Sequence, residues 1–262
     1  MQKVSCVIVC YNNANYINRA IESVIKQTRI PDEVIVADDG SSDASREIIS
    51  SLALKYPVIK PIFRETNLGV AANRDLAIRS ASHPFVTTLD GDDWFYPEKI
   101  QIEMDLVNLG ADVAYSDYTY INENDICIER VCLKTFSELD SRHRLEWIAM
   151  RNGYIPRDIM FRKEIYESIG GLDHDLKTHE DWDLKLRLSN TDAVWKYNPG
   201  MGTAYRRAGQ GLSATGRLRR CRSQLKVLGR NYSMLKTEIG LTALFRVYMQ
   251  TLVRMARIIS VG

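Results

Sequence analysis

Short apolar runs alternate with helical-period segments over the first hundred residues of the chain. The helical segments place apolar side chains three or four positions apart, as Ile17, Ile21 and Val24 do, which is the spacing of an amphipathic helix. The apolar runs have the length and the β-branched content of buried strands. The pattern predicts strands at 4–10, 34–37, 58–63 and 85–89, with helices at 17–25, up to about 55 and at 70–79.

Four strand–helix alternations with short connections predict an α/β fold. The expected architecture is Rossmann-like, with a mostly parallel central sheet, right-handed connections and helices on both faces. In such sheets, ligands bind beyond the carboxyl ends of the strands. A polar cluster follows each predicted strand, and the clusters are Tyr11-Asn12, Asp38-Asp39, Asn67 and Asp90 to Asp93. Their convergence predicts one binding site at this edge of the sheet.

The last cluster brings three carboxylates together directly after a strand, interrupted only by Gly91. If the chain stays extended there, Asp90 and Asp92 point to the same side, because strand side chains alternate with a period of two. Crowded carboxylates repel one another and favour a cation. Oxygen ligands suit Mg²⁺ or Mn²⁺, which in turn hold phosphates. Most acidic runs are solvated loops, so the cluster alone is weak evidence for a metal site.

After residue 110 the regular alternation stops. Two strands joined by a short polar turn predict a hairpin, and a later helix starts with Glu180 and Asp181, whose carboxylates suit the positive end of a helix dipole. The segment from about 118 to 159 has no clear pattern, and we expect it to determine substrate specificity. The predicted elements are strands at 111–121, 126–133, 193–197 and 202–206 and helices at about 142–150 and 180–188.

Composition favours a cytoplasmic protein. The five cysteines are odd in number and lack Cys-x-x-Cys spacing, which argues against a disulfide framework or a zinc site. The run at 4–10 has strand length and no signal-peptide cleavage region. No apolar segment approaches the roughly 20 residues that a membrane-spanning helix needs.

The net charge of +2 conceals an asymmetry along the chain. Residues 214–262 contain ten basic residues and one acidic residue, a net charge of +9, so the preceding 213 residues carry −7. A nucleic-acid-binding fold carries its basic surface on the folded domain, so we expect no nucleic-acid partner. An acidic body with a basic tail instead suits an anionic membrane or a protein partner.

The basic tail has a helical pattern of its own. From residue 242, a helical wheel gathers Arg246, Gln250, Arg254 and Arg257 within about 80° and leaves a wide apolar remainder. One interpretation is a helix packed on the rest of the chain or across a homodimer. The other is a peripheral helix lying on the inner face of the cell membrane.

Several segments of the chain match one known family in order and spacing. They are VIVCYN (7–12), EVIVADDGSSD (33–43), NLGVAANR (67–74), LDGDD (89–93) and GGLD (170–173) with EDW (180–182). Each is weak alone, but the set is specific and covers roughly residues 3 to 213. The chain resembles an inverting family 2 glycosyltransferase with the GT-A fold.

This resemblance implies a pocket for a nucleotide-sugar donor, most often UDP-linked. Tyr11 is implied to lie against the base, and Asp39 to accept a hydrogen bond from the base edge. Asp90 is implied to approach the ribose and the metal. The other donor-binding residues implied by the resemblance are Val9, Asp38, Asn67 and Arg74.

The resemblance also implies the chemistry. Asp92, together with Asp90, would ligate Mn²⁺ or Mg²⁺ on the diphosphate, where the cation neutralises charge on the leaving group. Asp181 would be the general base that deprotonates the attacking acceptor hydroxyl, so that a single displacement inverts the anomeric configuration. One departure is Ala208, which stands where the family often has a metal-binding histidine. Gln210, Ser213 or a water would have to substitute there.

The implied domain organisation is a catalytic domain at 1–213, with a donor half at about 1–110 and an acceptor half at about 111–213, followed by a basic amphipathic helical extension at 214–262. The implied function is metal-dependent sugar transfer to a hydroxyl of a glycan or lipid-linked acceptor in surface polysaccharide synthesis. One alternative is a degenerate module that binds a nucleotide sugar without turnover. A sugar nucleotidyltransferase is the other, although residues 11–15 lack the glycine and the cation of a triphosphate-binding loop.

Overall fold

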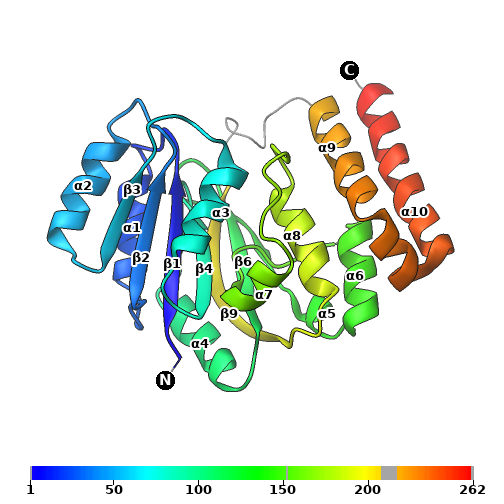
Figure 1. The fold of residues 1–262 in the computed structure, drawn as a ribbon, viewed down its shortest axis with the longest axis horizontal. Coiled ribbons are helices and arrows are strands. Elements are labelled where there is room, and N and C mark those ends of the chain that lie inside the picture. The colour runs from blue at the N-terminus through cyan, green and yellow to red at the C-terminus, as the bar shows by residue number, and fades with distance from the viewer. Residues whose placement is uncertain (1, 152, 208–216, 261–262) are drawn as a thin grey trace.

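The four predicted N-terminal strands form the parallel part of one sheet (Figure 1). The structure is a computed structural model that describes residues 2–151, 153–207 and 217–260. Both neighbours of the central strand β1 run parallel to it, as expected for buried, apolar strands joined by crossover helices. In sheet order, this part comprises β3 (Ile59–Phe63), β2 (Glu33–Asp38), β1 (Val4–Cys10) and β4 (Phe85–Asp90).

Beyond β4 the sheet becomes mixed. The short strand β8 lies between β4 and β6 and is antiparallel to both, whereas β9 runs parallel to β6. The expected hairpin is confirmed, because β6 and β7 pair antiparallel. The strands of this part are β5 (Trp94–Phe95), β6 (Val113–Ile121), β7 (Cys127–Val131), β8 (Met160–Arg162) and β9 (Trp195–Arg206).

The last strand differs from the prediction. Two separate strands were expected at 193–197 and 202–206, and the structure has the single strand β9. Its register against β6 shifts between Ser116 and Tyr118, where Pro199 and Gly200 are accommodated as an irregularity. Proline donates no hydrogen bond to a sheet, so a bulge absorbs it and the strand continues.

Helices cover both faces of the sheet. Alternate residues of β1 point to opposite faces, so Cys6 and Ile8 pack with helices on one side and Val7 and Val9 with helices on the other. The first face carries α1 (Ile17–Ile25), α2 (Ser45–Lys55) and α4 (Lys99–Asn108). The second carries α3 (Val70–Ser80), α5 (Lys134–Ser137), α6 (Ser141–Met150), α7 (Lys163–Ser168) and α8 (Glu180–Ser189).

The C-terminal extension forms two helices, α9 (Arg217–Arg230) and α10 (Tyr232–Ser260), and α10 is kinked at Gly240, whose φ is 81°. Figure 1 shows the pair beside α6 and α8, at the end of the molecule away from β1 to β3. Buried side chains of the extension, such as Leu235 and Val247, belong to the same hydrophobic core as the buried side chains of α6 and α8. The packed-helix interpretation therefore holds for one face of α10. Within the described ranges, every helix is too short or too polar to cross a bilayer.

Candidate active site

The carboxyl end of β4 brings the acidic cluster against β1. Asp90 pairs with Val9 in the sheet, and the Gly91 amide donates to the Val9 carbonyl oxygen at 2.9 Å. A Cβ at Gly91 would lie only 2.8 Å from that oxygen, so this approach requires glycine. The strand ends at Asp90, and the Asp93 amide turns back to the Asp90 carbonyl. The extended conformation considered for Asp90 and Asp92 is therefore wrong, because the chain turns between them.

The turn nevertheless places the carboxylates of Asp90, Asp92 and Asp93 close together. Burial and the charge of Asp90 raise the pKa of Asp92 to about 6. Burial and the charge of Asp92 also raise the pKa of Asp93, whose Oδ1 accepts the Arg206 amide at 2.7 Å. The Arg206 guanidinium donates to the Asp92 carbonyl oxygen at 2.9 Å and so holds the turn from β9. Each added negative charge thus opposes the ionisation of its neighbours.

This cluster fits a divalent cation whose coordination is completed by a substrate. The Oδ2 atom of Asp93 is buried and has no hydrogen-bond partner among the described residues. Within those residues, no group of three His, Cys, Asp or Glu side chains forms a ready-made metal site. Mg²⁺ is commonly bound by one or two carboxylates together with phosphates and waters, so a set of protein ligands as small as Asp92 and Asp90 would be compatible with it.

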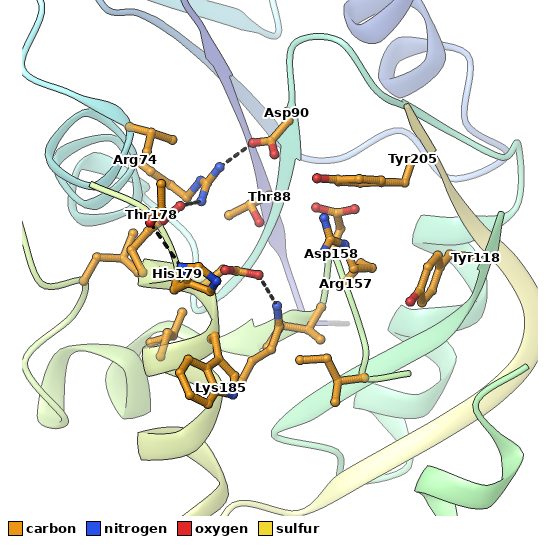
Figure 2. Close-up of a pocket in the computed structure, with 18 of the residues that line it drawn as sticks. Arg74, Thr88, Asp90, Tyr118, Arg157, Asp158, Thr178, His179, Lys185 and Tyr205 are labelled. Carbon is orange, nitrogen blue, oxygen red and sulfur yellow. Dashed lines mark hydrogen bonds and ion pairs between the residues drawn. The ribbon is translucent and has the colours of Figure 1, made fainter. Parts of the chain in front are cut away.

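Arg74 links the cluster to α8. Its guanidinium donates to Asp90 on β4 and, at 2.8 Å, to Glu180 at the first position of α8 (Figure 2). Burial lowers the pKa of Arg74, but the charges of Asp90 and Glu180 outweigh that effect and raise it. A buried, permanently charged group thereby joins two elements that are distant in the sequence.

Asp181 follows Glu180 in the first turn of α8. Its Oδ2 accepts a hydrogen bond from Lys185 at 3.0 Å, and 39% of its side chain is exposed. Burial raises the pKa of Asp181, but Lys185 and Arg157 oppose it strongly enough to lower the pKa overall. Asp181 is therefore an ionised carboxylate that a ligand can reach.

These side chains surround a cavity of about 700 Å³ (Figure 2). Its walls come from α3, β4, β6, the segment before β8, α8, β9 and α10. Aromatic rings from β6, α8 and β9 line it together with charged groups. The lining residues include Arg74, Thr88, Asp90, Tyr118, Tyr120, Arg151, Arg157, Asp158, Glu180, Asp181, Trp182, Lys185, Tyr205 and Arg254.

Of the residues implied by the resemblance, Arg74, Asp90 and Asp181 meet in this cavity. Asp38 and Asp39 lie beside it, at the end of β2. Asp38 is fully buried and accepts the Ser41 amide at 3.0 Å, so it holds the turn after the strand. Asp39 accepts the amides of Leu68 and Gly69 at 2.8 and 2.9 Å, which ties the β3–α3 loop to the end of β2.

The remaining implied donor residues lie along the same edge. Val9 is buried in the core of the α3 face, whereas Tyr11 is 49% exposed just beyond β1. Asn67 is exposed in the loop that Asp39 holds. The edge outside the cavity therefore combines an accessible aromatic ring with polar side chains. Ala208, Gln210 and Ser213 lie outside the described residues.

The sequence analysis missed Arg157 and Asp158. They precede β8, which has only three residues and runs antiparallel to β4. The register pairs Thr87 with Met160, so residues 157 and 158 extend toward Asp90 at the carboxyl edge of the parallel strands. Burial and the Asp90 charge raise the pKa of Asp158. The only sequence signal was a polar pair directly before an apolar stretch.

The C-terminal extension also reaches the site. Ser223 on α9 donates to the Thr178 carbonyl oxygen at 2.6 Å, and the Gln224 amide nitrogen lies 3.3 Å from His179 Nε2. His179 has a φ of 66° and directly precedes Glu180. Arg254 of α10 lines the cavity. The extension therefore contacts the loop from which α8 starts.

Comparison with known proteins identifies the family of the chain. The model of the family "Glycosyl transferase family 2" matches residues 5–170. A glycosyltransferase of Rickettsia felis is 38% identical over 136 residues, which are 52% of this chain and 22% of that protein. The glycosyltransferase YwdF of Bacillus subtilis is 31% identical over 196 residues, covering 71% of this chain and 68% of YwdF. The chain thus spans less than a third of the Rickettsia relative but most of YwdF.

Solved structures share the fold. Residues 1–349 of S. aureus TarS in complex with UDP-GlcNAc superpose with a TM-score of 0.68 at 17% identity, covering 98% of this chain and 83% of TarS 1–349. The same TarS fragment in complex with UDP gives a TM-score of 0.64 at 20% identity and covers 90% of this chain and 73% of that fragment. The expected GT-A fold is confirmed, and the chain belongs to glycosyl transferase family 2.

Proposed function

We propose that this chain transfers a sugar from a UDP-linked donor to an acceptor hydroxyl, with inversion at the anomeric carbon. The observation that carries this proposal is the series of contacts from Asp90 through Arg74 to Glu180, beside which Asp181 lines the cavity. A carboxylate of the acidic cluster and an ionised candidate base thereby face one space. The TarS complexes with UDP and UDP-GlcNAc support a nucleotide sugar as the donor class.

In this proposal the nucleotide lies across the carboxyl ends of β1 and β2. The accessible ring of Tyr11 suits the flat face of a base. Asp39 can accept the imide proton of uracil while it holds the loop at 68–69, because each carboxylate oxygen has two lone pairs. Asn67 borders the same edge from the loop.

Four further residues complete the donor site. Arg74 and Asp90 are proposed to contact the ribose and diphosphate at the cavity rim, where both already line the wall. Val9 and Asp38 support the site from below, through core packing and through the turn at Ser41.

Asp92, with Asp90, is proposed to hold Mn²⁺ or Mg²⁺. The pKa of Asp92, raised to about 6 by burial and by Asp90, indicates a carboxylate in negative surroundings, where a cation would be favourable. A bound cation would neutralise the charge that develops on the leaving diphosphate. Phosphate oxygens and waters would supply its other ligands.

Asp181 is proposed as the general base. It takes the proton of the acceptor hydroxyl as that oxygen bonds to the anomeric carbon. The bond from that carbon to the diphosphate breaks, and its electron pair leaves with UDP. Lys185 keeps Asp181 ionised before the reaction, and the 39% exposure of the side chain leaves room for the acceptor. A single displacement from the opposite face inverts the configuration.

A panel of UDP-sugars with Mn²⁺ tests the proposal by thermal stabilisation followed by UDP release with and without acceptor. At least one UDP-sugar should stabilise the protein in a Mn²⁺-dependent way and release UDP. Stabilisation without any release would favour the degenerate binding module. If no nucleotide sugar raises the melting temperature, the donor assignment is wrong.

We further propose a glycan or lipid-linked acceptor of surface polysaccharide synthesis, reached at the anionic inner face of the cell membrane. The outer face of α10 exposes large apolar side chains, while its opposite face packs into the core. Exposed Arg222, Lys226 and Arg246 lie on the same pair of helices. The exposed apolar residues are Leu241, Phe245, Met249, Leu252 and Val253.

Charge complementarity favours lipid over a second protein copy. The region 214–262 carries +9, and two such surfaces would repel each other across a dimer. Basic residues near an anionic surface contribute about 1 kcal/mol each, and salt weakens that contribution. The five cysteines are free thiols, which is typical of the cytoplasm.

Liposome flotation tests this surface with anionic and neutral vesicles at low and high salt. The protein should float with anionic vesicles only, and Phe245→Gln with Leu252→Gln should abolish flotation without lowering the melting temperature. A dimer in sedimentation that the same substitutions dissociate, with no flotation, would assign the face to a second copy instead.

A further inference from the structure

The strongest unexplained feature of the cavity is Asp158. It is a half-buried carboxylate at the start of β8, and its Oδ2 is fully buried without a hydrogen-bond partner among the described residues. Buried polar atoms in folded proteins nearly always have partners, because an unpaired one loses its hydration without compensation. Asp158 lines the cavity with the accessible part of its side chain, so a bound ligand can donate a hydrogen bond to the carboxylate from there.

Asp93 Oδ2 and Arg74 Nε are also buried without partners among the described residues, but each has an explanation. Asp93 Oδ2 belongs to the acidic turn proposed to lie beside the cation. Arg74 Nε belongs to a guanidinium whose other nitrogens already bind Asp90 and Glu180. Neither explanation extends to Asp158, which forms no ion pair with the residues that the structure describes and lies in the segment before β8.

The surroundings of Asp158 restrict the kind of ligand. Arg157 stacks on the ring of Tyr205 at 3.7 Å and provides positive charge next to the carboxylate, as Lys185 does across the cavity. A second cation is therefore not required to balance Asp158. What the carboxylate lacks is a hydrogen-bond donor. An anionic ligand group is disfavoured, because it would meet both Asp158 and Asp90.

The cavity walls favour a sugar ring. Tyr118, Tyr120, Tyr205 and Trp182 contribute apolar parts of the wall, against which C–H groups of a pyranose can pack, although Arg157 covers one face of Tyr205. Sites of this type combine apolar walls with a few polar groups that fix orientation. Hydroxyl groups are uncharged donors of the right size for a buried carboxylate oxygen.

We propose that Asp158 is a specificity-determining residue that accepts hydrogen bonds from the hydroxyl groups of a neutral sugar in this cavity. The proposal rests on the sugar-transfer function above. The sugar can be the unit transferred from the donor or the terminal unit of the acceptor. Both present the same chemistry to Asp158, and the experiment separates them.

The donor arm compares UDP, a UDP-sugar and the matching deoxy analogues by calorimetry with the full chain and Mn²⁺. If Asp158 binds the transferred sugar, Asp158→Asn and Asp158→Ala should lower the affinity for the UDP-sugar by about tenfold or more and leave the affinity for UDP unchanged. The variants should also lose the discrimination of the parent protein against one deoxy analogue, which a merely structural change would not cause.

The acceptor arm measures transfer kinetics. If Asp158 binds the terminal sugar of the acceptor, the same variants should keep the parental affinity for the donor and raise the acceptor KM by about tenfold or more. Asp105→Asn, an exposed carboxylate on α4, is the matched control and should change neither quantity. Unchanged UDP affinity and melting temperature show that each variant is folded, and Asp158→Ser replaces any variant that is not.

The experiments distinguish failure of the proposed sugar-transfer function from failure of the role proposed for Asp158. If the parent protein binds no UDP-sugar and transfers nothing, the proposed function fails before any variant is tested, and this inference fails with it. If the parent binds and transfers normally but Asp158→Asn matches it in donor affinity, analogue discrimination and acceptor KM, only the role of Asp158 is wrong.

Discussion

The Ser223 hydroxyl on α9 donates a hydrogen bond of 2.6 Å to the carbonyl oxygen of Thr178, three residues before Asp181. Nearby, Asn231 donates to Asp183 within α8 at 2.7 Å. Both contacts bind the C-terminal extension to the segment that carries the candidate base. The proposed boundary at 213/214 therefore marks a change in net charge along the chain. It is not a structural separation, because the extension contacts the segment that carries Asp181.

We predict that Ser223→Ala lowers kcat several-fold and leaves the affinity for UDP unchanged. The loss of this contact should loosen the left-handed turn at His179 and so broaden the positions of Asp181, and a small misplacement of a catalytic group is costly. Transfer kinetics and UDP calorimetry measure the two quantities. Ser223→Thr should restore kcat, and Ser233→Ala, an exposed serine on α10, is the matched control. Equal kcat in parent and Ser223→Ala would contradict a positioning role.

We predict that Asp181→Asn preserves donor affinity and slows transfer by roughly 10²–10⁴-fold, the usual effect of losing a general base. Asparagine retains the shape of the side chain next to Lys185 but cannot take the proton. Single-turnover transfer and UDP-sugar calorimetry check this, with the exposed Asp192→Asn as control. Transfer at the parental rate would shift the assignment to Glu180, although its bond to Arg74 favours a structural role.

We predict that Asp92→Asn abolishes the Mn²⁺-dependent part of UDP binding while the protein stays folded. A cation bound by only one or two carboxylates loses most of its affinity when one is removed. The measurement is UDP calorimetry with Mn²⁺ and with EDTA, in the parent and in the variant. The two proteins should bind UDP alike in EDTA and differ in Mn²⁺. Identical Mn²⁺ dependence in both would show that the metal, if bound, uses other residues.

Part of the site was predictable because Tyr11, Asp38 and Asp90 lie at the carboxyl ends of regular strands. The apolar runs before Tyr11, Asp38 and Asp90 identify parallel strands, and parallel strands bring their carboxyl ends to one edge. Arg157 and Asp158 were missed because β8 has only three residues and runs in the opposite direction, so the same edge receives its beginning rather than its end.

The contact between Arg74 and Glu180 could not be read from local pattern either. The two residues are 106 positions apart and meet only after α8 packs beside α3. The resemblance implied a donor-binding role for Arg74 and included Glu180 only in the matched EDW segment, and it did not indicate that one guanidinium joins Glu180 to Asp90. Likewise, the wheel of α10 indicated an amphipathic helix, whereas only packing against α6 and α9 shows which apolar residues remain exposed.

We predict that Asp39→Ala weakens UDP binding by about 1–3 kcal/mol, the cost of leaving a buried hydrogen-bonding group without its partner. The structure adds a second consequence, because Asp39 also accepts the amides of Leu68 and Gly69. Asp39→Asn retains one acceptor oxygen and should be affected less. UDP calorimetry together with the melting temperature separates base recognition from loop support. A lower melting temperature with unchanged UDP affinity would assign Asp39 to the loop alone.

The last prediction concerns stability and pH at Glu33, remote from the cavity. Its buried carboxylate accepts hydrogen bonds from Ser5, Lys60 and Ser82 and so joins β1, β2, β3 and the segment before β4. Burial alone raises the pKa of Glu33, but Lys60, Ser5 and Ser82 outweigh it and lower the pKa from 4.5 to about 2.

A carboxylate whose pKa is lower in the folded state stabilises that state above the unfolded pKa, and this contribution is lost as the pH falls through the folded pKa. Glu33 should therefore contribute about 2–3 kcal/mol near neutral pH. Urea unfolding of the parent and of Glu33→Gln should show this difference at pH 7 and a steady decrease as the pH is lowered from 5 toward 2. The exposed Glu65→Gln is the control. A difference between parent and Glu33→Gln that stays constant over this range would mean that the ionisation of Glu33 does not stabilise the sheet.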